Sequence, residues 1–325
     1  MRASFLATLA GSLSLAKISL GINIISSNDD GWAEVNIRSF FDSLSDAGHS
    51  VVISAPAENQ SGKGLLIIHS RLVSQWLNEY IDIGSFEETP TTLDRPCEFN
   101  SCPTGSPAVG HNSSEPRLNY VNSYPATSMK YGINSIGPKF FDGPPDLAVA
   151  GPNVGNNIGI AVYFSGTAGA ATYAAHHDGI PAIAFSGATG SQTAWNASSS
   201  YPHYSQVYAD AATNFTNLLV ATGIPYLPND IWLNVNFPSV SETKCASSED
   251  ISFVLSRIHV AVPLITPDDV TTCGGNRLPS EIGVSFASGC YASVSVGMAG
   301  TKEDANATMQ GVVLKKLGDV FTCLP

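Results

Sequence analysis

The stretch ISLGINIISSNDDG, residues 18–31, combines a β-branched run with a polar cluster that ends in glycine. This pattern predicts a buried strand over 18–27, followed by a functional loop at Asn28-Asp29-Asp30-Gly31. Apolar side chains then recur at helical spacing over 32–47, and Gly48 follows where such a helix would end. The β-branched residues 51–53 are typical of a second strand. The N-terminal part therefore predicts a βαβ unit.

The middle of the chain repeats this alternation of strands and helices. Strands are expected over 146–150, 181–186 and 231–237, a loop over 151–159, and helices over 165–178 and 204–222. Strands that alternate with helices indicate an α/β fold with a mostly parallel sheet. We expect a core over 17–238. Residues 65–80 form an atypical apolar insertion, and no element is assigned to them.

The C-terminal part, 239–325, has a different pattern. Four of the six cysteines lie there, and short strand-like pieces over 251–255 and 291–296 are separated by Gly, Pro and Ser. We therefore expect a smaller extension that contains disulfides and packs on the core.

Composition and charge limit the classes of function. The 325 residues are 43% hydrophobic and 13% charged, which is typical of a globular protein. The net charge of −12 argues against binding a nucleic-acid polymer or an anionic membrane. A small anionic substrate remains compatible, since a bound divalent cation can dominate the local field. The sequence leaves a homo-oligomer open.

The N-terminus resembles a secretory signal. Arg2, an apolar stretch over 5–15 and the small-x-small site at 14–16 predict a signal peptide over 1–16. The alternative is a cytosolic first strand with a ragged start. After cleavage we expect no membrane span, because no second apolar run approaches the ~20 residues that one needs.

Cysteines and sequons favour an oxidising, extracellular setting. The six cysteines show no metal-binding spacing, so disulfides fit better, and the short loop between Cys97 and Cys102 makes that pair our one specific expectation. Five sequons are glycosylation acceptors. They lie at Asn59, Asn112, Asn196, Asn214 and Asn306.

The cluster at Asn28-Asp29-Asp30-Gly31 is the first candidate site. Ligands of doubly wound sheets bind at the carboxyl ends of strands, where this cluster lies. Two adjacent carboxylates repel each other, and a hard cation such as Mg²⁺, Mn²⁺ or Ca²⁺ relieves that repulsion. The alternative is an acidic turn that caps the following helix.

Three further segments follow predicted strands or begin a helix. The loop over 54–62 and the Gly/Asn-rich loop over 151–157 offer oxygen ligands, although an ordinary turn explains the second equally well. Ser165-Gly166-Thr167 begins a helix, where free N–H groups and the positive end of the helix dipole favour a phosphate. The alternative is that Ser165 is only an N-cap.

Six motifs occur in one order, and together they resemble the SurE (stationary-phase survival protein) phosphatase and nucleotidase family, in particular its secreted, cysteine-containing fungal branch. The resemblance covers roughly 21–62 and 97–238. It implies a Rossmann-like three-layer core, hydrolysis of nucleoside monophosphates or other small phosphate monoesters, and Mg²⁺ or Mn²⁺ as cofactor. The motifs are Asn28-Asp29-Asp30-Gly31, Ala55-Pro56 with Ser61-Gly62, Gly151-Pro152-Asn153, Ser165-Gly166-Thr167, Gly179-Ile180-Pro181 and Leu233-Asn234-Val235-Asn236.

The resemblance also implies roles for individual residues. The metal ligands would be Asp29, Asp30, Ser61 and Asn153, with Asp29 and Asp30 also catalytic through an activated water. The expected phosphate-binding residues are Asn28, Ser165, Gly166 and Thr167. A glycan at Asn59 would crowd the loop that carries Ser61, so we expect that sequon to be unoccupied.

Two departures from the family pattern define the alternatives. Ala150 replaces a small hydroxyl residue, and 65–80 has no family likeness. If that segment disturbs the Ser61 loop, the chain would be a secreted nucleotide- or metal-binding glycoprotein without turnover. A serine esterase is disfavoured, because the sequence has no Gly-x-Ser-x-Gly elbow.

Overall fold

The structure, a computed structural model, describes residues 21–61 and 88–325. The expected signal peptide over 1–16 and the insertion over 65–80 lie outside the described residues. Within the described part, no helix is long and apolar enough to cross a membrane.

The N-terminal βαβ unit forms as expected. Strand β1 (Asn23–Ser27) leads through α1 (Val35–Asp46) to β2 (Ser50–Pro56), and the two strands pair in parallel with Ile24 opposite Val51. Helix α1 begins where the Glu34 side chain accepts a hydrogen bond from the Asn36 N–H. Gly48, at φ +92°, follows the end of α1 in the left-handed conformation that glycine adopts at low cost.

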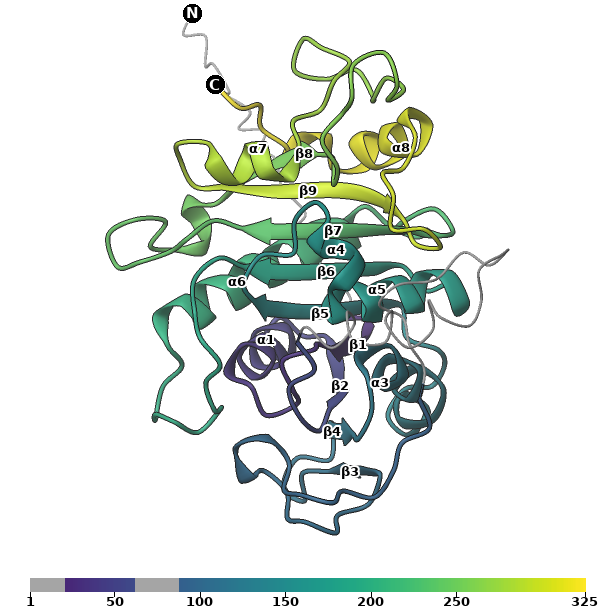
Figure 1. Cartoon of the computed structure of the whole chain (residues 1–325), viewed down its shortest axis with the longest axis vertical. Coiled ribbons are helices and arrows are strands. Elements are labelled where there is room, and N and C mark those ends of the chain that lie inside the picture. The colour runs from purple at the N-terminus through teal and green to yellow at the C-terminus, as the bar shows by residue number, and fades with distance from the viewer. Residues whose placement is uncertain (1–20, 62–87) are drawn as a thin grey trace, which may run out of the picture.

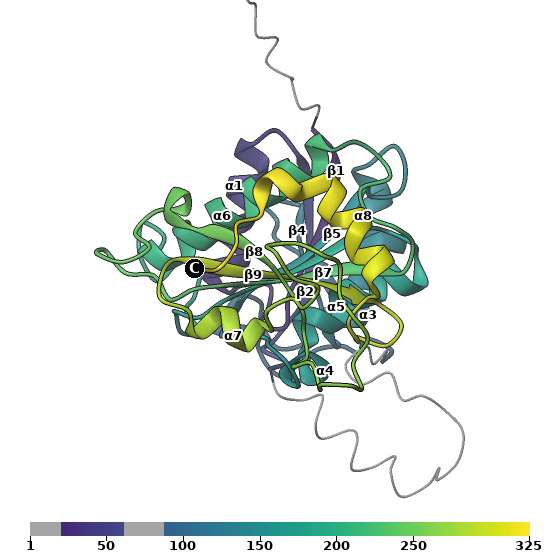
Figure 2. The same ribbon diagram turned by 90° about the horizontal axis from the view of Figure 1, so that it is seen from above.

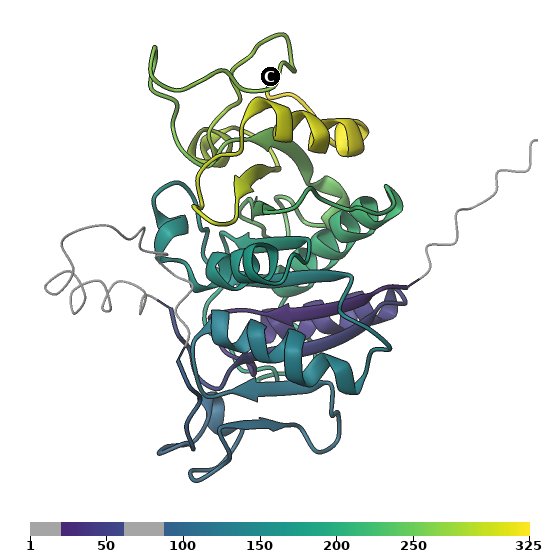
Figure 3. The ribbon, with the colours of Figure 1, turned by 90° about the vertical axis from the view of Figure 1, so that its right-hand side faces the viewer.

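One mixed sheet runs through the described part of the molecule, with the order β3-β4-β2-β1-β5-β6-β7-β9-β8 (Figure 1). Strand β1 lies between β2 and β5 and pairs in parallel with both, so the chain order reverses at β1 (Figure 3). This reversal is the switch point beside which such sheets bind ligands. The remaining strands are β3 (Val109–His111), β4 (Leu118–Val121), β5 (Leu147–Val154), β6 (Ala182–Gly187), β7 (Ile231–Phe237), β8 (Ser252–Ser256) and β9 (Tyr291–Met298).

Helices cover both faces of the sheet. In Figure 2, α1, α6 (His203–Ala221) and α8 (Ala307–Leu317) lie on one side, and α3 (Pro125–Tyr131) and α5 (Gly166–His177) on the other. Neighbouring residues of β1 alternate between two buried hydrophobic clusters, Ile24 in one and Ile25 in the other. The fold is therefore the Rossmann-like three-layer α/β arrangement expected from the sequence. Two short helices, α4 (Ala161–Phe164) and α7 (Glu281–Phe286), complete the α-helices of this part.

Strand β5 differs from the expectation. The segment Gly151-Pro152-Asn153, predicted as the start of a loop, continues the strand as far as Val154. Asn153 and Val154 pair with Ser186 and Gly187 of β6 after a register shift that begins at Ala150. A bulge of this kind lets a strand continue while it redirects side chains. It places Asn153 at the carboxyl end of β5.

The C-terminal part extends the same sheet. Strand β9 pairs antiparallel with β7, and β8 pairs in parallel with β9. Disulfides link Cys245 to Cys290 and Cys273 to Cys323, and the expected Cys97–Cys102 disulfide is also present. The boundary at 238/239 stays a prediction.

Candidate active site

Asp29 is buried and held by the first turn of α5. Its Oδ1 accepts a hydrogen bond from the Thr167 hydroxyl at 2.6 Å, and its Oδ2 accepts one from the Gly166 N–H at 3.0 Å. The Asp29 carbonyl accepts a third, from the Gln60 N–H of the loop after β2, at 2.7 Å. The loops after β1 and β2 and the beginning of α5 therefore converge on this residue.

Asp30 receives donors from three other segments. The Val154 N–H at the end of β5 donates to Oδ2 at 2.7 Å, and the Ser61 hydroxyl donates to Oδ1 at 3.2 Å. The amide of Gln192, on the loop after β6, also donates to Oδ1. Both carboxylate oxygens are thus fixed in direction.

Asn153 lies beside the two aspartates. Its Nδ2 donates to the carbonyls of Val154 and Gly155 at 3.2 and 2.6 Å, which leaves Oδ1 directed toward the Thr167 hydroxyl, 3.4 Å away. Because that hydroxyl also contacts Asp29, the Thr167 side chain brings oxygens of Asp29 and Asn153 close to each other. The structure thus brings together the four predicted metal ligands.

Two glycines permit this close packing. A Cβ on Gly166 would lie 2.7 Å from the Asp29 Cβ, and one on Gly31 would lie 2.1 Å from the Glu98 Oε2. Gly31 also has φ +102°, which disfavours any other residue. The site therefore depends on glycine at both positions.

Burial and like charge shape the electrostatics. Burial raises the pKa of Asp29, and burial together with the neighbouring charge of Asp29 raises the pKa of Asp30 to about 7. Burial, then the charge of Asp30, raises the pKa of Glu34 well above its usual range and that of Glu98 to about 8. Four carboxyl groups thus crowd a volume in which negative charge is costly. A divalent cation would offset that cost.

The donor set fits a hard cation. Within residues 21–61 and 88–325, no group of three or more His, Cys, Asp and Glu side chains could hold a metal ion by itself. The predicted set instead combines two carboxylates with the neutral oxygens of Ser61 and Asn153. Carboxylate, amide and hydroxyl oxygens suit Mg²⁺ and Mn²⁺ better than softer metals. The adjacent negative charges of Asp29 and Asp30 would attract such an ion.

The predicted phosphate-binding residues have structural partners in this arrangement. Asn28 and Gly31 form two hydrogen bonds with each other. The Asn28 Nδ2 donates to the Gly31 carbonyl at 3.1 Å, and the Gly31 N–H donates to the Asn28 Oδ1 at 3.2 Å. Ser165 caps α5 by accepting from the Ala168 N–H at 3.0 Å. With Gly166 and Thr167 bonded to Asp29, all four residues shape the site. Their contact with phosphate stays a prediction.

The asparagines of the Leu233-Asn234-Val235-Asn236 motif support the loop that leads to α5. Asn236 Oδ1 accepts from the Asn157 N–H at 2.8 Å, and Asn234 Nδ2 donates to the Asn157 carbonyl at 2.8 Å. Asn234 also bonds Glu281, which accepts from the Gly159 N–H at 3.1 Å. These residues hold the 157–159 loop against β7.

Gln192, Glu34 and Glu98 were not identified from the sequence. Glu98 approaches Gly31 from the segment closed by the Cys97–Cys102 disulfide, and that disulfide was the one available signal. Gln192 belongs to no recognisable motif.

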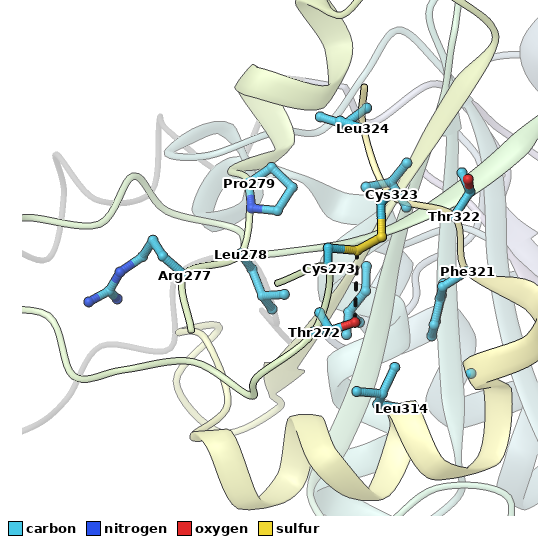
Figure 4. Close-up of a pocket in the computed structure, with 13 residues that line it drawn as sticks. Thr272, Cys273, Arg277, Leu278, Pro279, Leu314, Phe321, Thr322, Cys323 and Leu324 are labelled. Atoms are coloured by element: carbon cyan, nitrogen blue, oxygen red, sulfur yellow. Dashed lines mark hydrogen bonds between the residues drawn. A yellow bond between two sulfur atoms is a disulfide. The ribbon is translucent and has the colours of Figure 1, made fainter. Parts of the chain in front are cut away.

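A cavity of 420 Å³ lies elsewhere, between β8 and the C-terminal tail. In Figure 4 the Cys273–Cys323 disulfide forms part of its wall, and Arg277 points away from it. Its lining shares no residue with the site around Asp29.

Residues 24–257 match the family described as survival protein SurE. The chain belongs to the SurE family. The match includes both aspartates, Ser61, Asn153 and the beginning of α5.

Individual relatives of this chain bear names of phosphate-ester hydrolases. An acid phosphatase of Yarrowia lipolytica is 34% identical over 84% of this chain and 78% of that protein. A 5′-nucleotidase SurE of Desulfovibrio desulfuricans is 31% identical over 51% of this chain and 49% of that protein. The crystal structure of the SurE protein from Aquifex aeolicus matches with a TM-score of 0.53 at 19% identity, over 90% of this chain and 98% of that one. This last likeness shows the shared fold.

Proposed function

We propose that this chain is a phosphomonoesterase that depends on Mg²⁺ or Mn²⁺ and acts on nucleoside monophosphates or other small phosphate monoesters. Membership of the SurE family, together with the acid phosphatase and 5′-nucleotidase relatives, supports hydrolysis of phosphoric monoesters. The dependence on a metal and the class of substrate are proposed beyond what these relatives support. Secretion, as expected from the N-terminus and the disulfides, belongs to it as well.

One observation carries the proposal. Asp29 and Asn153 meet at the Thr167 hydroxyl, and Asp30 lies between the Val154 N–H and the Ser61 hydroxyl. Oxygen ligands from the loops after β1 and β2 and from the end of β5 thus converge at the switch point of the sheet. Asp29, Asp30, Ser61 and Asn153 would hold the cation, which when bound polarises a phosphate and makes a water more acidic.

The protein groups have distinct tasks. Thr167 and the Gly166 N–H keep Asp29 in one orientation, and Val154 does the same for Asp30, so little reorganisation is needed during reaction. One of the two carboxylates accepts the proton that the attacking water releases. The beginning of α5, with the positive end of its dipole, attracts the phosphate to the same edge of the sheet.

Phosphate release from a panel of 5′- and 3′-nucleotides and an aryl phosphate tests this function. The assay is run with Mg²⁺, with Mn²⁺ and with EDTA, across pH 4 to 8. We expect release with either metal and loss of release with EDTA. Release that is insensitive to EDTA contradicts metal dependence, whereas binding of nucleotide without release indicates a chain that has lost turnover.

The variant Asp29→Asn sharpens the test. Asparagine keeps an acceptor for Thr167 but removes the charge, so we expect turnover to fall about a hundredfold or more with the fold intact. Asp46→Asn, at the exposed end of α1, is the matched control and should leave turnover unchanged. Wild-type turnover by Asp29→Asn with added Mg²⁺ would refute the assignment.

A further inference from the structure

The loop after β6 reaches back to the aspartates. Gln192 has an exposed side chain, yet its Nε2 donates to the Asp30 Oδ1. The same oxygen accepts from the Ser61 hydroxyl at 3.2 Å, while the Val154 N–H occupies the other oxygen at 2.7 Å. Gln192 thus completes a set of three donors that determines the direction of the Asp30 carboxylate.

The backbone on the C-terminal side of Gln192 is fixed to the segment that precedes α1. The Val35 N–H donates to the Thr193 carbonyl at 2.9 Å, and the Trp195 N–H donates to the Ala33 carbonyl at 3.0 Å. These bonds tie the loop to the chain that immediately follows Asp30. The amide of Gln192 therefore has a defined position relative to its acceptor.

A stack of side chains strengthens the same contact. The Arg38 guanidinium is buried and lies 4.9 Å from the centre of the Trp32 ring and 5.4 Å from that of the Trp195 ring. Its Nε donates to the Trp32 carbonyl at 2.6 Å. A cation between two aromatic faces is favourable, and desolvation increases the effect. The stack links the loop of Gln192 to the loop of the aspartates.

We propose that Gln192 is a positioning residue of the site: its amide holds Asp30 in the orientation that binds the divalent cation, and the Trp32–Arg38–Trp195 stack holds the amide. This inference rests on the proposed metal-dependent function. Gln192 acts through Asp30 and is not a ligand itself. It therefore affects the affinity for the cation and the turnover number more than the affinity for substrate.

Calorimetric titration with Mn²⁺ tests the proposal independently of activity. Gln192→Met keeps the length of the side chain and removes the N–H donor. Because position 192 is exposed, we expect the variant to fold. Loss of such an outer partner weakens metal binding about tenfold to a hundredfold. We expect that loss in Kd, with a lower kcat and a nearly unchanged KM. Gln206→Ala, at an exposed position on α6, is the control and should match wild type.

A second variant tests the stack without touching Gln192. Trp195→Ala frees the loop, so we expect it to weaken Mn²⁺ binding in the same way. The double variant should bind Mn²⁺ no more weakly than Gln192→Met alone, because both changes disrupt the same contact between Gln192 and Asp30. Thermal unfolding of each variant verifies that it is folded.

The outcomes separate this proposal from the proposed function. If wild type binds Mn²⁺ and Gln192→Met binds it within twofold as tightly, the role of Gln192 is refuted and the metal-dependent function stands. Additive losses in the double variant refute the part assigned to the stack. If wild type binds no Mn²⁺ and releases phosphate in EDTA, the metal-dependent function fails, and the role of Gln192 fails with it.

Discussion

The contact between Gly166 and Asp29 yields a quantitative expectation for Gly166→Ala. The added Cβ would lie 2.7 Å from the Asp29 Cβ and 2.8 Å from the Pro125 Cγ. Carbon atoms in ordinary contact are about 3.5–4.0 Å apart, so Asp29 or the beginning of α5 must move by about 1 Å.

Two opposing effects on stability can be compared. Alanine is the better helix former by about 1 kcal/mol in a helix interior and by less at Gly166, the first residue of α5, but overpacking of a tight contact costs about 1–3 kcal/mol. We therefore expect a small net destabilisation. Activity should suffer much more, since a displacement of about 1 Å can cost about a hundredfold in rate.

The assays are kcat/KM for release of phosphate and calorimetric binding of Mn²⁺, each beside a thermal melt. Gly143→Ala is the matched control, because a Cβ at Gly143 meets no atom within 4 Å. A Gly166→Ala protein with wild-type kcat/KM and wild-type Mn²⁺ affinity would refute the claim that this contact positions Asp29.

Three other expectations concern stability and modification. Burial raises the pKa of Glu281 from 4.5 to about 8, so the folded protein keeps a proton that the unfolded chain releases. The unfolding free energy should thus fall by a few kcal/mol as pH rises from about 4.5 to about 8; urea titrations should show this slope in wild type and a weaker one in Glu281→Gln. Arg257→Met removes the buried cation that contacts Asp269 at 3.0 and 3.1 Å and Asp304 at 3.0 Å, and Asp269 keeps the longer pair with Arg277 at 3.5 Å; the change should cost about 3–5 kcal/mol by urea unfolding, and a loss under 1 kcal/mol would contradict this. Asn59 should carry no glycan, because a glycan there would crowd the site loop, in which the Ser61 N–H donates to the Asn59 Oδ1 at 2.6 Å; full occupancy in glycopeptide mass spectrometry would disprove it.

Much of the fold follows from local patterns. The helices α1 and α6 carry helical periodicity, the strands β1, β2, β6 and β7 carry β-branched or apolar runs, and α5 is a small-residue segment between Ser165 and Gly179. Caps such as Ser165 or the glycine after α1 mark helix ends. The helices α3, α4, α7 and α8 and the strands β3 and β4 were not predicted. They are short or weakly patterned, so tertiary packing rather than local preference stabilises them.

The residues of the site likewise divide into those that local sequence patterns predict and those that they do not. Asp29, Asp30 and Asn153 could be grouped because the carboxyl ends of parallel strands share one edge of a sheet. Gln192 could not, because its position depends on backbone pairing between 193–195 and 33–35, which leaves no periodic signal. Asn153 itself was expected on a loop, since Gly151-Pro152 reads locally as a turn although β6 continues the pairing beyond it.

Because the chain is synthesised from its N-terminus, the aspartates are made well before the distant groups that donate hydrogen bonds to them. Asp29 lies 137 residues before the Gly166 N–H that holds it, and Asp30 lies 162 residues before Gln192. At about 5–20 residues per second, a ribosome needs on the order of ten seconds to add the intervening chain. During this interval the aspartates are already made, while Gly166, Thr167 and Gln192, which donate to their carboxylates, do not yet exist. A nascent chain that stops before α5 therefore contains both carboxylates but neither donor from α5 that fixes Asp29.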